Sequence, residues 1–121
     1  MVKILIMAHC DIAQSFIKVA KHIMPNDVSY LHALSVEPYN SLVELKQALA
    51  NKCEQLGGEI LILTDVKGAS PYNAARVLQD EKVSVIAGLN LPMVLKALNH
   101  QKLPLEGLVE KVIEAGKEGI C

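Results

Sequence analysis

Two positions in this sequence combine a reactive side chain with the pattern of a strand that ends and a helix that begins. His9 follows one apolar run, and Asp65 follows another. A histidine can attack an electrophile through one ring nitrogen when an acceptor holds the other nitrogen as N–H. We therefore predict that His9 is a phosphorylatable nucleophile and that Asp65 is the acceptor that orients its ring.

The chain around these two positions favours an anion such as a phosphoryl group. The start of a predicted helix follows His9, and its free backbone N–H groups and positive dipole end attract phosphate oxygens. After Asp65, the residues Gly68 and Ala69 lead into Ser70-Pro71, which is typical of an N-cap followed by a proline at the first helical position. We expect Gly68, Ala69 and Ser70 to stabilise the phosphoryl oxygens, and Ser70 also to cap its helix.

Each of these residues also has an ordinary structural interpretation. From its position alone, His9 is equally well explained as a partly buried histidine whose ring hydrogen-bonds to the backbone. Asp65 is also explained as a turn residue that caps its own loop. Cys10 is an alternative nucleophile. A phosphatase-type Cys-x5-Arg motif would need arginine where Phe16 stands, so we interpret Cys10 as a small packing residue.

Other kinds of site lack the residues that they would need. An aspartyl-phosphate site at Asp65 would require paired acidic residues for Mg²⁺ after the first strand, where only Asp11 occurs. Neither of the glycine motifs that bind nucleotides is present. The remaining histidines show no metal-ligand spacing: His22, His32 and His100. The sequence therefore predicts neither a metal site nor a cofactor.

Composition sets the class of protein. With 121 residues, of which 51% are hydrophobic, the chain is expected to form a single domain over residues 1–121. Charged residues make up 21% of the chain and balance to a net charge of -1, which argues against binding to nucleic acid or to an anionic membrane. The three cysteines are odd in number and have no paired spacing, as expected for a reducing cytoplasm. No apolar run approaches membrane-spanning length.

Short apolar runs alternate with amphipathic stretches along the whole chain. Strands are expected at residues 3–8, 28–34, 59–64 and 82–87, and helices at residues 11–24, 41–56, 70–79, 91–99 and 105–115. The first helix is predicted to end at Pro25-Asn26 and the last to break at Gly116. Three further helix starts are predicted from their capping residues: Asp11 with Gln14, Ser41 with Glu44, and Asn90.

This alternation predicts an α/β fold, a doubly wound and mainly parallel sheet of four strands with helices on both faces. Residues 119–121 fit either a short antiparallel edge strand or a frayed tail. In such sheets, ligands bind beyond the carboxyl ends of the strands, where the strand order reverses. His9, Asp65, Ser70 and Asn90 are all expected at this edge.

Four motifs in order, over nearly the whole chain, resemble the EIIA domains of the mannose-type sugar phosphotransferase system, the mannose, fructose and sorbose family. The first motif is the strand that ends in His9. The other three are Asp-Val-Lys-Gly-Ala-Ser-Pro-Tyr-Asn-Ala-Ala at residues 65–75, Val-Ile-Ala-Gly-Leu-Asn-Leu-Pro-Met at residues 85–93, and Glu-Ala-Gly-Lys-Glu-Gly at residues 114–119.

The resemblance implies a phosphotransferase component that acts in sugar transport from the cytoplasm. By this resemblance, His9 accepts a phosphoryl group from the phosphohistidine of HPr and passes it to a histidine of a separate EIIB, through which it associates with EIIC and EIID at the membrane. Asp65 would hydrogen-bond the ring nitrogen that does not attack. Ser70 and nearby backbone amides would stabilise the phosphoryl oxygens, and no metal or organic cofactor is implied.

The chain also departs from the family pattern. The family commonly has glycine after its histidine, where this chain has Cys10. Members often form homodimers by exchanging a C-terminal antiparallel strand, for which residues 118–121 remain here. Two alternative functions share the fold. One is a stand-alone regulatory phosphoprotein that reports the phosphorylation state of HPr, and the other is a non-catalytic binding domain.

Overall fold

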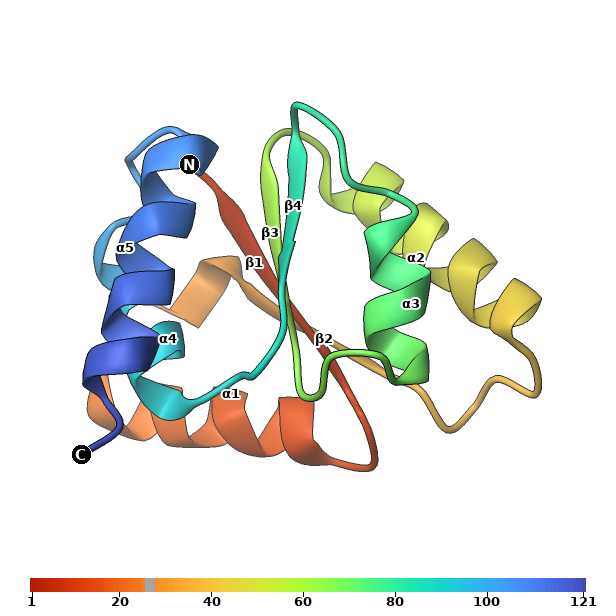
Figure 1. The fold of residues 1–121 in the computed structure, drawn as a ribbon, viewed down its shortest axis with the longest axis horizontal. Coiled ribbons are helices and arrows are strands. Elements are labelled where there is room, and N and C mark those ends of the chain that lie inside the picture. The colour runs from red at the N-terminus through yellow and green to blue at the C-terminus, as the bar shows by residue number, and fades with distance from the viewer. Residues whose placement is uncertain (26–27) are drawn as a thin grey trace.

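The computed structural model describes residues 1–25 and 28–121, and its centre is a parallel β-sheet. The strands lie in the order β2-β1-β3-β4, and every neighbouring pair is parallel (Figure 1). Their bounds are β1 Lys3–Ala8, β2 Leu31–Ser35, β3 Ile60–Thr64 and β4 Val83–Ile86. This arrangement confirms the predicted four-stranded, doubly wound α/β fold.

Helices cover both faces of this sheet. In Figure 1, α1, α4 and α5 lie on one side, and α2 and α3 lie on the other. The bounds of the helices are α1 Ile12–Ile23, the short 3-10 helix η1 Val28–Tyr30, α2 Leu42–Leu56, α3 Ser70–Arg76, α4 Leu91–Asn99 and α5 Leu105–Glu118. The two central strands are thus shielded from water on both faces, which explains why their sequences are continuous apolar runs.

Alternate residues of the central strands enter two separate cores. On β1, Ile4 and Ile6 belong to the core beneath α1, α4 and α5, whereas Leu5 and Met7 belong to the core beneath α2 and α3. All four side chains are fully buried. Because one step along the strand changes the core that a side chain enters, the position of each strand against its neighbour is strongly fixed.

The chain reverses its direction of travel across the sheet between β1 and β3. From β1 the chain moves outward to β2, and from β3 it moves outward to β4 on the opposite side. The carboxyl ends of β1 and β3 are adjacent, and their last paired residues are Met7 and Thr64. This is the point at which open α/β sheets bind ligands, and His9 and Asp65 follow these two strands.

Two of the predicted helix caps are confirmed, and two are wrong. Ser41 accepts a hydrogen bond from the Glu44 backbone N–H at 3.2 Å, and Asn90 accepts one from the Met93 backbone N–H at 3.1 Å. Asp11 makes no side-chain capping bond to α1. Ser70 is not a cap at all, because Ala69 occupies the N-cap position and Ser70 is already the first residue of α3.

The second strand begins later than the sequence predicts. Residues 28–30 form the 3-10 helix η1, and β2 runs from Leu31 to Ser35. The helix before it, α1, ends at Ile23, and Asn26 of the predicted Pro25-Asn26 stop lies outside the described residues.

The last helix passes through Gly116 instead of breaking there. A Cβ atom at Gly116 would lie 2.7 Å from Cγ of Met93, so this glycine lets α5 approach α4 closely. The Asn90 side chain donates to the Gly116 carbonyl at 3.0 Å and ties the two helices together. The prediction failed because the glycine serves packing between helices and not a helix end. Residues 119–121 form no strand within this chain. They are not a frayed tail either, because the N–H groups of Gly119 and Ile120 donate to the carbonyls of Ala115 and Lys117 at the end of α5.

The two glycines of α5 should respond differently to a larger side chain. We expect Gly116→Val to lower the free energy of unfolding by about 1–3 kcal/mol, because the new side chain overlaps the buried Met93. Gly107→Val is the matched control, since a Cβ atom there meets nothing within 4 Å. Urea unfolding of both variants measures the difference. Equal destabilisation would show that the contact between α4 and α5 is not tight.

Candidate functional site

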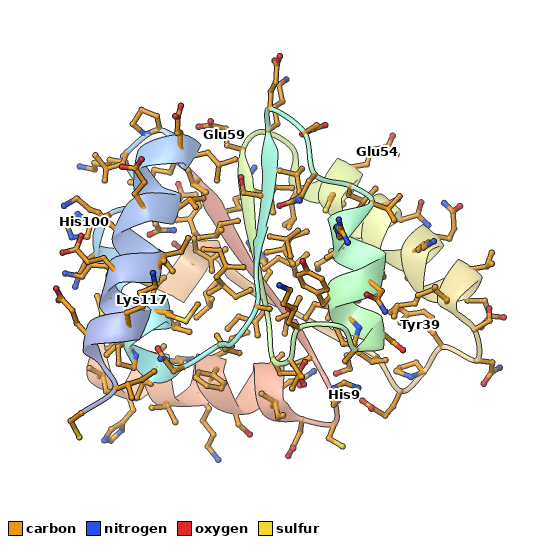
Figure 2. The ribbon with its side chains drawn as sticks, viewed as in Figure 1. His9, Tyr39, Glu54, Glu59, His100 and Lys117 are labelled. Carbon is orange, nitrogen blue, oxygen red and sulfur yellow. The ribbon has the colours of Figure 1, made fainter. Side chains whose placement is uncertain are left out.

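A single carboxylate oxygen joins the ends of β1 and β3. Oδ2 of Asp65 lies 2.7 Å from Nδ1 of His9 and also accepts a hydrogen bond from the His9 backbone N–H at 3.1 Å. The other oxygen, Oδ1, accepts from the Val66 backbone N–H at 2.9 Å. The His9 side chain is 41% exposed and the Asp65 side chain 11% exposed, so the acceptor is shielded while the ring reaches solvent. Figure 2 shows His9 at the edge of the molecule toward which β1 and β3 run.

The hydrogen bonds keep Asp65 ionised. Burial is the largest single influence and raises the pKa of its carboxyl group. The hydrogen bonds from the His9 ring, the His9 backbone and the Val66 backbone act in the opposite direction, and together they hold this pKa below its ordinary value. An ionised carboxylate can only accept hydrogen bonds. The neutral ring of His9 must then carry its proton on Nδ1, which leaves the lone pair on Nε2.

The loop from β1 to α1 contains an unusual backbone conformation. Cys10 has a φ of 51°, in the left-handed region that favours glycine. The His9 carbonyl accepts a hydrogen bond from the Ile12 backbone N–H at 3.2 Å and closes a tight turn. Cys10 is exposed, so its predicted role as a packing residue is wrong. Cys10 therefore occupies a backbone position that glycine would adopt at a lower cost.

The loop from β3 to α3 is also a tight turn. Gly68 adopts a φ of 87°, and its carbonyl accepts from the Asn73 side chain at 3.0 Å. Ala69 is the N-cap of α3, and the exposed Ser70 follows it. These residues come three to five positions after Asp65, at the same edge of the sheet. Backbone N–H groups at a helix start have no partner within the helix and can bind an anion, although the Ala69 N–H here donates to the Val66 carbonyl at 3.4 Å.

Not every predicted residue belongs to this site. His9 and Asp65 are in contact, and Gly68, Ala69 and Ser70 lie in the loop and first turn that follow Asp65. The side chain of Asn90 instead caps α4 and bonds to α5, so it serves the packing of these helices.

One contact near the site was not predicted from the sequence: that between Ser35, at the end of β2, and the loop that carries Cys10. Ser35 Oγ donates to the Cys10 carbonyl at 3.4 Å. Local patterns do not contain such a contact, because it depends on which residues of β1 and β2 pair.

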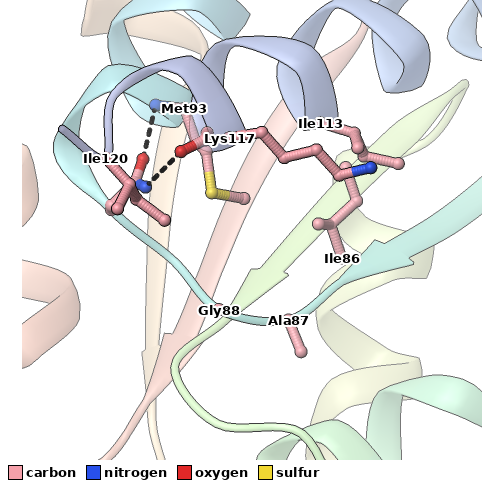
Figure 3. Close-up of a pocket in the computed structure, with 9 residues that line it drawn as sticks. Ile86, Ala87, Gly88, Met93, Ile113, Lys117 and Ile120 are labelled. Carbon is pink, nitrogen blue, oxygen red and sulfur yellow. Dashed lines mark hydrogen bonds between the residues drawn. The ribbon is translucent and has the colours of Figure 1, made fainter.

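A separate cavity lies between the end of β4 and the C-terminal part of α5 (Figure 3). Its volume is about 190 Å³. The walls are mostly apolar and consist of Ile86, Ala87, Gly88, Asn90, Met93, Ile113, Gly116, Lys117 and Ile120. None of these residues was predicted to bind phosphate.

Within residues 1–25 and 28–121, no group of three or more histidine, cysteine, aspartate or glutamate side chains is arranged to hold a metal ion. None of the helices in this part of the chain is both long and apolar enough to cross a membrane.

Comparison with known proteins identifies similar chains. The family model described as "PTS system fructose IIA component" matches residues 3–113. The mannose-specific EIIAB component of Escherichia coli strain K12 is 30% identical over 125 residues, which cover 98% of this chain and 38% of that protein. The chain therefore spans well under half the length of that relative. The sorbose-specific EIIA component of Lacticaseibacillus casei is 28% identical over 120 residues, covering 96% of this chain and 86% of that protein.

A solved structure is similar over the whole chain. The EIIA component of the phosphotransferase system from Streptococcus agalactiae superposes with a TM-score of 0.90 at 30% identity, covering 100% of this chain and 96% of that chain. The mannose/sorbose IIA subunit from Enterococcus faecalis superposes with a TM-score of 0.87, covering 99% of this chain and 92% of that chain, and at 22% identity it shows the fold.

Asp65 should make stability depend on pH at the acidic end. Its pKa is lowered by folding, so the stability that the ionised group contributes is complete above the pKa of the unfolded chain, about 3.9, and is lost as the pH falls through the lower folded pKa. We expect the difference in free energy of unfolding between wild type and Asp65→Asn to shrink below about pH 4. Urea unfolding at a series of pH values measures it.

The control for this experiment is Asp11→Asn, which removes one negative charge from an exposed side chain that makes no capping bond. A difference between wild type and Asp65→Asn that stays constant or grows toward acid would contradict the argument. It would mean that the hydrogen bonds do not favour the ionised carboxylate.

Proposed function

Because the chain belongs to the mannose-type EIIA family of the sugar phosphotransferase system, we propose that it carries a phosphoryl group on Nε2 of His9. The group arrives from the phosphohistidine of HPr and leaves to a histidine of EIIB. The observation that carries this proposal is the 2.7 Å contact between His9 Nδ1 and Asp65 Oδ2, which leaves the opposite ring nitrogen with its lone pair directed away from the carboxylate.

The transfer step requires a nucleophile that is already in its reactive form. The Nε2 lone pair attacks the phosphorus atom, a nitrogen–phosphorus bond forms, and the bond to the donor imidazole breaks with its electron pair returning to the donor nitrogen. Positive charge develops on the His9 ring as the bond forms. The Asp65 carboxylate stabilises this charge through Nδ1–H, and it does so without reorganising because its position is fixed in advance.

The phosphoryl oxygens also need partners. The Ala69 N–H already donates to the Val66 carbonyl at 3.4 Å. We therefore place the oxygens against the Gly68 N–H and against Ser70, where α3 begins. Transfer between two histidines is close to balanced in energy, so the site has to align donor and acceptor and to steady a loose transition state. We assign the alignment to His9 and Asp65, and the stabilisation of the transition state to the loop after Asp65.

The partners follow from the same role. EIIB receives the phosphoryl group, and through EIIB the chain associates with the membrane components EIIC and EIID. We place the reaction in the cytoplasm, where the three cysteines would remain as thiols.

Phosphorylation by HPr tests the proposed function. Incubation with phosphorylated HPr should add one phosphate that is labile to acid and stable to alkali, as expected for phosphohistidine. His9→Ala should take up none. Asp65→Asn should slow transfer by about 10- to 1,000-fold, since both the tautomer and the charge stabilisation are lost. Rapid-quench measurement with radiolabelled HPr gives the rates.

The control for this test is His100→Ala, which removes a histidine outside the site. Transfer that persists in His9→Ala would place the phosphoryl group on another residue. An unchanged rate in Asp65→Asn would mean that Asp65 serves only the turn.

We also propose that the chain forms a homodimer through its C-terminal residues. In the described part of the chain, β4 is an edge strand, and the cavity beside it is lined by Ile86, Ile113 and Ile120. The Ile120 side chain is 74% exposed. Residues 118–121 of a second copy would cover the strand edge and this apolar surface together.

A charge at the proposed dimer interface should separate the copies. We expect Ile120→Asp to convert a dimer into a monomer, because a carboxylate would be buried against apolar side chains. Light scattering after size-exclusion chromatography gives the mass. Val77→Asp is the control, since Val77 is also exposed but lies at the end of α3. A monomeric wild-type protein, or an unchanged dimer in Ile120→Asp, would contradict the proposal.

A further inference from the structure

The loop that carries His9 is tied to the neighbouring strand by two side chains. Ser35 is the last residue of β2, and it pairs with Ala8, the last residue of β1. Its hydroxyl accepts a hydrogen bond from the Gln14 side chain at 2.7 Å and donates one to the Cys10 carbonyl at 3.4 Å. A chain of hydrogen bonds thus runs from α1 through β2 to the residue directly after His9.

The residue at the end of this chain needs support. Cys10 has a φ of 51°, and a residue with a Cβ atom adopts that conformation at a cost that glycine does not have. No glycine occurs between residues 9 and 23 to relieve it. Such conformations persist when the surrounding structure fixes them. The Ser35 hydroxyl reaches this residue from outside the loop, at the Cys10 carbonyl.

The conformation of Cys10 bears directly on His9. Both the backbone N–H and the ring of His9 must reach the same Asp65 oxygen, at 3.1 Å and 2.7 Å. Cys10 shares a peptide bond with His9, so a change in its φ would turn that peptide unit and alter the path of the loop relative to Asp65. Two bonds to one atom leave little room for such a change.

We propose that Ser35, supported by Gln14, is a positioning residue that holds the loop at Cys10 so that the His9 ring keeps its hydrogen bond to Asp65. The proposal rests on the phosphoryl-carrier function above, because it concerns the same nucleophile. Ser35 touches neither the phosphoryl group nor the ring, and it acts through the backbone of Cys10. Half-buried at the end of an edge strand, Ser35 is otherwise an ordinary strand residue.

The test compares Ser35→Ala in two backgrounds. With Cys10 present, Ser35→Ala should slow transfer from phosphorylated HPr by about 3- to 10-fold, the size expected for losing one hydrogen bond. In the Cys10→Gly background the same change should slow transfer by less than about 1.5-fold, because glycine adopts a φ of 51° without support. Ser35→Thr keeps the hydroxyl and should retain the wild-type rate.

Nitrogen-15 NMR of the His9 ring measures its tautomer, which would not change if Ser35 served only the stability of the fold. Ser35→Ala should reduce the population of the Nδ1–H tautomer when Cys10 is present and leave it unchanged in the Cys10→Gly background. Ser15→Ala is the control, since Ser15 is an exposed serine next to Gln14. Thermal unfolding of each variant checks that it is folded at the assay temperature.

The two proposals can fail separately. If the wild type takes no phosphoryl group from phosphorylated HPr, the carrier function is wrong, and the NMR comparison alone decides the role of Ser35. If Ser35→Ala lowers the tautomer population equally in both backgrounds, or in neither, then Ser35 does not act through Cys10 and the inference is overturned.

Discussion

The candidate site depends on one shared hydrogen-bond acceptor, Oδ2 of Asp65. The backbone and the ring of His9 both bond to it, so the carboxylate fixes the position of the loop and the orientation of the imidazole together. Its low exposure matters, because water competes less for a shielded acceptor and the hydrogen bonds are correspondingly stronger. The same bonds keep the carboxyl group ionised, which in turn fixes the tautomer of the ring.

The register between β1 and β3 places this acceptor beside His9. The last paired residues of β1 and β3 are Met7 and Thr64, so Asp65 comes one position and His9 two positions beyond this pair. A slip of one residue would move every apolar side chain of β1 into the wrong core, and the two cores prevent it. Packing energy far from the site therefore holds His9 and Asp65 at hydrogen-bonding distance. The strand order reverses at the same place, which is where open α/β sheets bind ligands.

Local patterns predicted the fold and the pairing of His9 with Asp65, but they failed where the backbone or a distant element decides. Ser41 and Asn90 cap their helices from extended backbone, with φ and ψ of -147° and 160° and of -138° and 167°. Asp11 has φ -99° and ψ 19°, and in that conformation its side chain makes no cap, although its residue type is equally suitable. The prediction that the last helix breaks at Gly116 failed because the residue that Gly116 packs against, Met93, lies on another helix. From the sequence alone, a glycine that ends a helix cannot be distinguished from one that lets two helices pack closely.

Cys10 shows how the same conformational requirement can be met in two ways. A glycine after the histidine would satisfy the left-handed turn by its own freedom, and the requirement would then be local. With a cysteine there, the conformation has a cost, and the Ser35 hydroxyl at the end of β2, itself bonded by Gln14 of α1, donates to the Cys10 carbonyl. In the proposed arrangement, the position of His9 depends partly on the pairing of β1 with β2 and not only on the residue that follows it. The loop after His9 is therefore tied to β2 through the pairing of Ser35 with Ala8 and the bond from Ser35 to the Cys10 carbonyl.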